Sequence, residues 1–86
     1  MAALGLLERI ERGREAQVLL DHPLLQEAFK GVEAGVVDQW KGCADAVSRE
    51  TLWAGLHGAR RVETFLRAMA DDGQMAAHEA AQAENT

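Results

Sequence analysis

The sequence predicts an all-α protein: a three-helix domain with an antiparallel hairpin of its second and third helices, followed by an acidic C-terminal tail. The composition favours helix over strand, because Ala, Leu, Glu, Gln and Arg are abundant and β-branched residues are scarce. Three segments repeat apolar residues at spacings of three and four, as amphipathic helices do. The 86 residues suffice for one domain, and a domain this small buries only about 60% of its unfolded surface.

The first predicted helix covers residues 3–20. Its apolar stripe consists of Leu6, Ile10, Gly13, Ala16 and Leu20. Gly13 lowers the stability of this helix unless a neighbouring helix approaches closely at that point. Acidic and basic residues alternate along the same segment, as Glu8, Arg9, Glu11, Arg12, Arg14 and Glu15. We interpret this alternation as a solvated, ion-paired face and not as an element that binds nucleic acid.

The second predicted helix covers residues 23–41. Pro23 lacks an N–H group and suits the first turn of a helix, and it disfavours helical backbone in the residue before it. We therefore expect Pro23 to begin a new helix rather than to kink one long helix. The apolar stripe restarts after it as Leu25, Phe29, Val32, Val36 and Trp40. The segment GCADAVS that follows is the predicted loop.

The third predicted helix begins at Ser48, which is a good N-cap residue, and ends at Gly73, which suits a left-handed C-cap. Asp71 and Asp72 would lie at the negative end of this helix, so we expect fraying there. The remaining segment is rich in alanine and contains two glutamates and no Lys or Arg, but it has almost no apolar periodicity. The prediction is thus a helical domain over residues 1–73 and an acidic, mobile tail over residues 74–86.

The three apolar stripes together give the predicted core. Its members are Leu6, Ile10, Leu20, Leu25, Phe29, Val32, Val36, Trp40, Leu52, Leu56, Val62, Leu66 and Met69. Three short helices with wide apolar stripes often leave one stripe poorly covered. Because contiguous exposed apolar surface favours association, this is a physical reason to expect that the protein binds itself.

The charge is unevenly distributed along the chain. The net charge is −5, and residues 71–86 account for −4 of it. A nearly neutral body does not supply the cluster of cations that sequence-independent DNA binding needs. Cys43 is the single cysteine, which excludes an intrachain disulfide. No basic region precedes the short apolar N-terminal run, and no segment is long enough to span a membrane, so we expect a soluble cytoplasmic protein.

The sequence contains no recognisable pattern of catalytic or metal-binding residues. His22, His57, His78 and Cys43 lack the spacing of metal ligands, since they include neither an i,i+4 histidine pair nor a CxxC motif. The segment GLHG is not followed by the Gly-Lys-Ser/Thr of a phosphate-binding loop. We therefore expect a protein that is not an enzyme, with no catalytic residue, no metal, no cofactor and no small-molecule substrate.

Six residues are candidates for binding a protein partner: Trp40, Trp53, Phe65, Arg60, Arg61 and Arg67. Tryptophan is enriched at interaction hot spots. Trp40 and Trp53 both lie near one end of the predicted hairpin, although packing into the core is the alternative for them. Arg60 and Arg67 have only Glu63 nearby as a compensating charge, so they could bind a phosphate or carboxylate, with ordinary solvation as the alternative.

Several segments resemble a group of short helical proteins encoded by tailed bacteriophages and prophages. They are ERGREAQVLLDHPLLQEAF, then Trp40, then RETLW and VETFL before Gly73. The resemblance covers residues 8–73. Members of the group look non-enzymatic and are commonly encoded among genes for head assembly and DNA packaging. The resemblance therefore implies a virion or assembly role in the bacterial host cytoplasm, but it supplies no functional residue.

These observations leave three functions open. The first is a bacteriophage structural or assembly protein that acts through helix–helix contacts, as a homo-oligomer. The second is a small acidic inhibitor or regulator of a host protein, of the anti-defence type, whose tail mimics the charge of nucleic acid. The third is a DNA-binding packaging-initiation subunit that presents Arg60, Arg61 and Arg67, which the near-neutral body and the acidic tail favour least.

Overall fold

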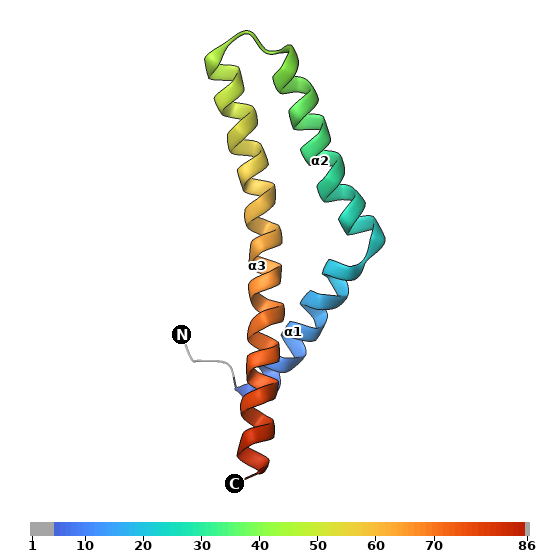
Figure 1. Ribbon diagram of the computed structural model, residues 1–86, viewed down its shortest axis with the longest axis vertical. Helices are drawn as coiled ribbons and strands as arrows, with labels where there is room; N and C mark the ends of the chain where they lie inside the picture. Colours follow the sequence, from blue (N-terminus) through green and yellow to red (C-terminus); the bar gives the residue numbers. More distant parts are fainter. Residues whose placement is uncertain (1–4, 86) are drawn as a thin grey trace.

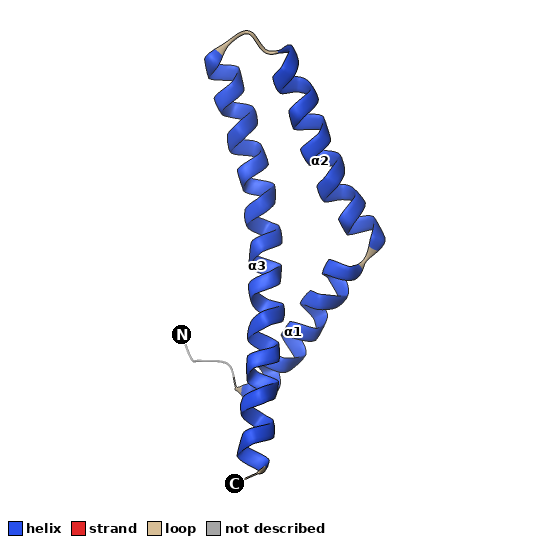
Figure 2. Ribbon diagram, in the orientation of Figure 1, coloured by secondary structure: helices blue, strands red, loops and turns tan. Residues whose placement is uncertain are grey.

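The computed structural model describes residues 5–85, which form three α-helices and contain no strand. α1 covers Leu6–Asp21, α2 covers Pro23–Gly42 and α3 covers Ala46–Glu84. Figure 2 shows that only short turns separate the helices. α2 and α3 run in opposite directions on either side of the loop at residues 43–45 (Figure 1). The predicted all-α class is confirmed, while the predicted helix start at residue 3 lies outside the described residues.

The chain turns between α1 and α2 because Pro23 begins the second helix (Figure 1). His22 has an extended backbone (φ −70°, ψ 121°), the conformation that a following proline favours. Its Nδ1 accepts a hydrogen bond of 3.1 Å from the N–H of Leu24 and so caps α2. Gln26 Nε2 donates to the carbonyl oxygen of Leu20 at 3.0 Å across the turn. The prediction that Pro23 opens a new helix is confirmed.

α3 begins at Ala46, which precedes the predicted N-cap Ser48. The N-cap is Asp45, whose carboxylate accepts hydrogen bonds from the N–H groups of Val47 at 3.4 Å and Ser48 at 3.2 Å. The Ser48 hydroxyl donates to the same carboxylate at 2.8 Å. The prediction of Ser48 as the cap is wrong because the two oxygens of Asp45 satisfy the free N–H groups one turn earlier. These bonds, foremost the one from the Ser48 hydroxyl, lower the pKa of Asp45.

α1 packs against the C-terminal half of α3 at a crossing of small residues (Figure 1). Gly13, Ala16, Ala70, Gly73 and Ala76 are all buried. The two backbones are so close that a Cβ built on Gly73 would lie 2.7 Å from the Cα of Gly13. Of the two possibilities that the sequence leaves open for Gly13, the structure shows the close approach of a neighbouring helix.

Arg9 ties α1 to α3 beside this crossing. Its Nε donates to Asp72 Oδ2 at 3.0 Å and its Nη2 donates to Asp72 Oδ1 at 2.7 Å, which is a bidentate pair. Its Nη1 lies 3.6 Å from Glu79 Oε2. The hydrogen bond from Arg9 lowers the pKa of Asp72, and the same bond raises the pKa of Arg9. The interpretation of Arg9 as part of a self-paired face is wrong, because its partners lie on another helix.

α3 does not end at Gly73 as predicted but continues to Glu84. None of the described glycines has a positive φ, so Gly73 is a helical residue at a close crossing and not a left-handed cap. Ala76 is fully buried, and Glu79 reaches Arg9 on α1. Residues 74–84 therefore extend the helical unit, and the predicted division at residue 73 corresponds to no break in α3. The expectation of fraying at Asp72 is also wrong, since Asp72 lies well before the end of α3 and its carboxylate accepts hydrogen bonds from Arg9.

The described part of the chain buries few large side chains. Leu56 is only 4% exposed, and the other buried hydrophobic residues are Ala16, Ala70 and Ala76. Most of the predicted core is half-buried, namely Leu6, Ile10, Leu20, Leu25, Phe29, Val36, Leu52, Leu66 and Met69. The prediction is wrong for Val32, Trp40 and Val62, which are exposed. The physical reason is that α1 and α2 follow one another along α3 instead of forming a three-cornered bundle (Figure 1), so each stripe faces at most one neighbour.

The resulting molecule is long and thin. Its principal extents are 62 × 29 × 17 Å. α3 has 39 residues, which corresponds to about 58 Å of helix, so it spans nearly the whole length. The radius of gyration is 18.1 Å, compared with about 12 Å for a compact domain of this chain length. The single chain is therefore much more elongated than a compact globular domain.

The two lowered carboxylate pKa values predict a loss of stability at acid pH. Because the pKa values of Asp45 and Asp72 are lower in the folded state than in the unfolded chain, their stabilising contribution is complete above about pH 4 and is lost as the pH falls further. We expect the melting temperature to fall below about pH 4, and to fall less in the double variant Asp45→Asn, Asp72→Asn. Thermal melts followed by circular dichroism between about pH 3 and about pH 7 measure this fall in melting temperature. Asp71→Asn is the control, and an equal acid response in all three proteins would contradict the prediction.

Candidate protein-interaction surface

The end of the molecule at the α2–α3 loop carries an apolar groove of about 520 Å³. We call it the tip groove, and its lining residues are Val36, Val37, Trp40, Ala46, Arg49, Glu50, Trp53 and Leu56. α2 contributes the first three from adjacent helical positions, and α3 contributes the others from its first three turns. A groove of this kind between two helices suits the apolar face of another helix.

Trp40 and Trp53 line the tip groove from different helices, and they are 44% and 52% exposed. The guanidinium carbon of Arg49 lies 4.8 Å from the Trp40 ring centroid, and its Nε donates to the carbonyl oxygen of Cys43 at 2.8 Å. The His57 ring packs edge-on against Trp53, with centroids 4.7 Å apart and an interplanar angle of 87°. The two indoles are thus oriented by neighbouring side chains but are not covered by them.

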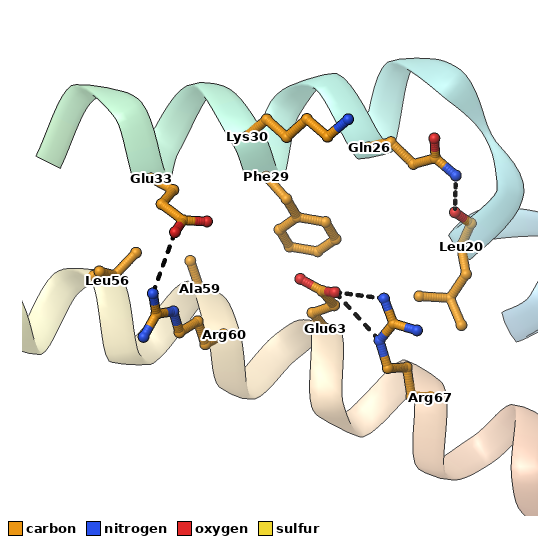
Figure 3. Close-up of a pocket in the computed structure, with 10 residues that line it drawn as sticks. All are labelled: Leu20, Gln26, Phe29, Lys30, Glu33, Leu56, Ala59, Arg60, Glu63 and Arg67. Carbon is orange, nitrogen blue, oxygen red and sulfur yellow. Dashed lines mark hydrogen bonds and ion pairs between the residues drawn. The ribbon is translucent and has the colours of Figure 1, made fainter. Parts of the chain in front are cut away.

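A second cavity of about 330 Å³, the central pocket, lies between α2 and α3 further from the loop (Figure 3). Phe29 points from α2 toward α3 in this cavity, and Leu56 lines both the pocket and the tip groove. Arg60 Nη2 lies 3.3 Å from Glu33 Oε1, so an ion pair links the two helices at the rim. An apolar lining with a charged rim therefore extends along the space between α2 and α3.

The structure brings three of the six predicted binding residues together. Trp40 and Trp53 share the tip groove, and the guanidinium of Arg60 lies 6.0 Å from the Trp53 ring. Arg67 lies at the central pocket, where its Nη2 and Nε donate to Glu63 Oε1 at 2.7 and 3.2 Å. Glu63, the one compensating charge that the sequence places near Arg60 and Arg67, thus forms an i,i+4 ion pair with Arg67.

The other two predicted residues lie elsewhere. Phe65 is exposed and lines a depression at the α1–α3 crossing, together with Arg9, Arg12, Ala68, Met69 and Asp72. Arg61 is exposed on α3 outside both the tip groove and the central pocket. These positions separate Phe65 and Arg61 from the cluster around the two tryptophans, so the six residues do not form one site.

Sequence reasoning did not single out four of the residues that line the tip groove, Val37, Ala46, Arg49 and Glu50. Val37 lies beside the predicted stripe, and its contribution could have been recognised from its place next to Val36. The role of Arg49 depends on the loop that brings it over Trp40, and neither the helical period nor a local motif contains that geometry. Leu56 was predicted as core, and it is both buried and part of the groove floor.

The His, Cys, Asp and Glu side chains of residues 5–85 form no group of three or more that could hold a metal ion. Within the same residues, none of the helices is both long enough and apolar enough to cross a membrane.

Comparison with known proteins gives no match, either to a protein-family model, to a curated protein or to a solved structure. Support for a function therefore comes from the chain's own surface.

Proposed function

We propose that the protein is a non-enzymatic assembly protein that acts through helix–helix contacts as a homo-oligomer. The observation that carries the proposal is the small core: of the described hydrophobic residues, only Leu56 and three alanines are buried, whereas twelve large hydrophobic side chains are exposed. A chain of this size is marginally stable alone, so contacts with a partner contribute a large share of its stability. The proposed setting, head assembly or DNA packaging of a tailed bacteriophage, rests on the sequence resemblance alone.

The described ion pairs give little support to the two alternative functions. Two of the four acidic residues between residues 71 and 86, Asp72 and Glu79, already face Arg9, which reduces the charge available to mimic nucleic acid. Arg60 pairs with Glu33 and Arg67 pairs with Glu63, which reduces the positive charge available for DNA phosphates. The surface therefore best supports a function in which the protein acts through apolar contacts between helices.

The mass in solution tests the proposal. Light scattering on a sizing column is expected to give a discrete multiple of 9.4 kDa at high protein concentration. The oligomer should persist as the salt concentration rises, because apolar contacts are not screened, in contrast to binding through phosphate contacts. A single species of 9.4 kDa at every concentration would contradict self-association and would favour binding to a host protein instead.

A further inference from the structure

The accessible surface of the chain is large for its mass. It is 6704 Å², compared with about 5,000 Å² for a compact protein of 9.4 kDa. The excess, about 1,700 Å², is more than the roughly 800 Å² that one partner contributes to a standard interface, and it falls in the range of obligate dimers. An interface of the size found in obligate dimers would therefore reduce the exposed surface of each chain to that of a compact protein.

Exposed apolar side chains concentrate on what we call the arm, which is residues 23–70. Eight of the twelve exposed large hydrophobic residues belong to it, namely Leu24, Val32, Val37, Trp40, Val47, Trp53, Val62 and Phe65. Trp40, Trp53 and Val37 surround the tip groove, which also has Leu56 in its lining. Aromatic residues in a concave apolar site are the usual centre of an interface, so the groove is the part of the arm most suited to being covered.

The distribution of charge favours a second copy of the chain as the partner. The arm contains six acidic and six basic residues, so its net charge is zero. Two arms can therefore meet without net repulsion. A strongly charged partner would not be attracted to the arm, because the arm carries no net charge of opposite sign. Residues 71–86 carry a net charge of −4, and the described part of this segment, residues 71–85, lies at the end of α3 remote from the loop (Figure 1). Parallel arms would place two such segments side by side, whereas antiparallel arms keep them apart.

We infer that a second copy of this chain covers the tip groove, arm against arm, around a two-fold axis that passes near the groove. The two arms run in opposite directions, and the acidic ends of α3 lie at opposite ends of the dimer. α2 and α3 of both copies then form a four-helix bundle whose core includes both pairs of tryptophans. This inference rests on the proposed self-association and adds the surface and its orientation.

A pair of matched substitutions in the full-length chain tests the surface. Val37 in the groove is 42% exposed and Val62, on another face of the arm, is 56% exposed, so an aspartate at either position stays in contact with water in the single chain. In the dimer only Val37→Asp places a charge in the interface. We expect it to raise the dimer dissociation constant at least about tenfold, and Val62→Asp to change it less than about twofold. Sedimentation gives the constants, and circular dichroism checks that helix content is unchanged.

Tryptophan fluorescence provides a second readout, because Trp40 and Trp53 are the only tryptophans and both line the groove. Emission should shift to shorter wavelength as the wild-type protein is concentrated, and Val37→Asp should move this shift to higher concentration. An oligomer unaffected by Val37→Asp, or weakened equally by Val62→Asp, would overturn the groove as the interface while leaving the proposed function intact. A monomer at all concentrations would overturn both.

Energy transfer between dyes tests the orientation. The dyes are attached to Ala81→Cys, an exposed position on α3, in a Cys43→Ser background that leaves no other thiol. Antiparallel arms place the two labels farther apart than the 62 Å length of one chain, so we expect almost no transfer within a dimer of confirmed mass. Efficient transfer in that dimer would mean that the acidic ends are neighbours and would overturn the proposed arrangement.

Discussion

Replacing Gly73 with alanine is expected to destabilise the protein, although alanine favours helix over glycine by about 1 kcal/mol. The new Cβ would lie 2.7 Å from the Cα of Gly13 and 3.1 Å from the carbonyl oxygen of Arg9. Because these are backbone atoms, which cannot rotate away, α1 must move off α3. We expect the free energy of unfolding to fall by about 1–3 kcal/mol, as in other overpacked sites. Urea unfolding followed by circular dichroism, at one fixed protein concentration, measures it.

The reciprocal substitution and two controls make this test specific. A Cβ on Gly13 would lie 2.6 Å from the Cα of Gly73, so Gly13→Ala should have a loss of similar size. At Gly31 and Gly35 on α2, a Cβ would meet nothing within 4 Å. Alanine at either position should therefore raise the free energy of unfolding by about 0.5–1 kcal/mol. If alanine changed the free energy of unfolding in the same direction at the crossing and on α2, α1 and α3 would not be in close contact.

Replacing Leu56 with aspartate is expected to have a comparable or larger effect. Leu56 is the one large hydrophobic side chain that is buried among the described residues, and it lines both cavities between α2 and α3. Removing a buried leucine side chain typically costs about 2–5 kcal/mol, and a carboxylate at the same place adds the cost of an unpaired buried charge. We expect α2 to separate from α3, with loss of helical circular dichroism and a lower melting temperature.

Leu24→Asp is the matched control for this substitution. Leu24 lies in the first turn of α2 and is 65% exposed, so a carboxylate there remains in water and at the favourable end of the helix. Its melting temperature should stay close to that of the wild type. If Leu56→Asp also left the circular dichroism and the melting temperature unchanged, the apolar stripe of α3 would be wrongly assigned.

The sequence predicts this fold well where local chemistry decides it. The start of α2 follows from Pro23, because proline restricts the backbone in a way that can be recognised without the rest of the chain. Gly13 only leaves open that another helix approaches there. The helical class follows from periodicity and composition. The cap at Asp45 was missed because Asp45 and Ser48 are both good N-cap residues, and only the backbone geometry decides between them.

The remaining errors all concern contacts between segments far apart in the chain. The sequence predicts a helix end at Gly73 because glycine suits a left-handed C-cap, but the close approach of α1 requires a glycine at that point. Arg9 was assigned to neighbouring glutamates, although its partner Asp72 lies 63 residues away. The core prediction assumed that three stripes meet, which depends on how helices arrange in space. The sequence identifies the tryptophans as candidates without Arg49, because the position of Arg49 over Trp40 depends on the loop between α2 and α3.

The crossing of α1 with α3 has a consequence for the order of folding. Gly13 and Gly73 are about sixty residues apart, so their contact closes a loop that contains all of α2 and much of α3. Closing a loop of that length costs chain entropy before any packing compensates for it. α2 and the neighbouring part of α3 are joined by only a short loop and can pair early, whereas α1 docks late. We therefore expect α1 to dock after α2 and α3 have paired, and its detachment to leave the arm folded.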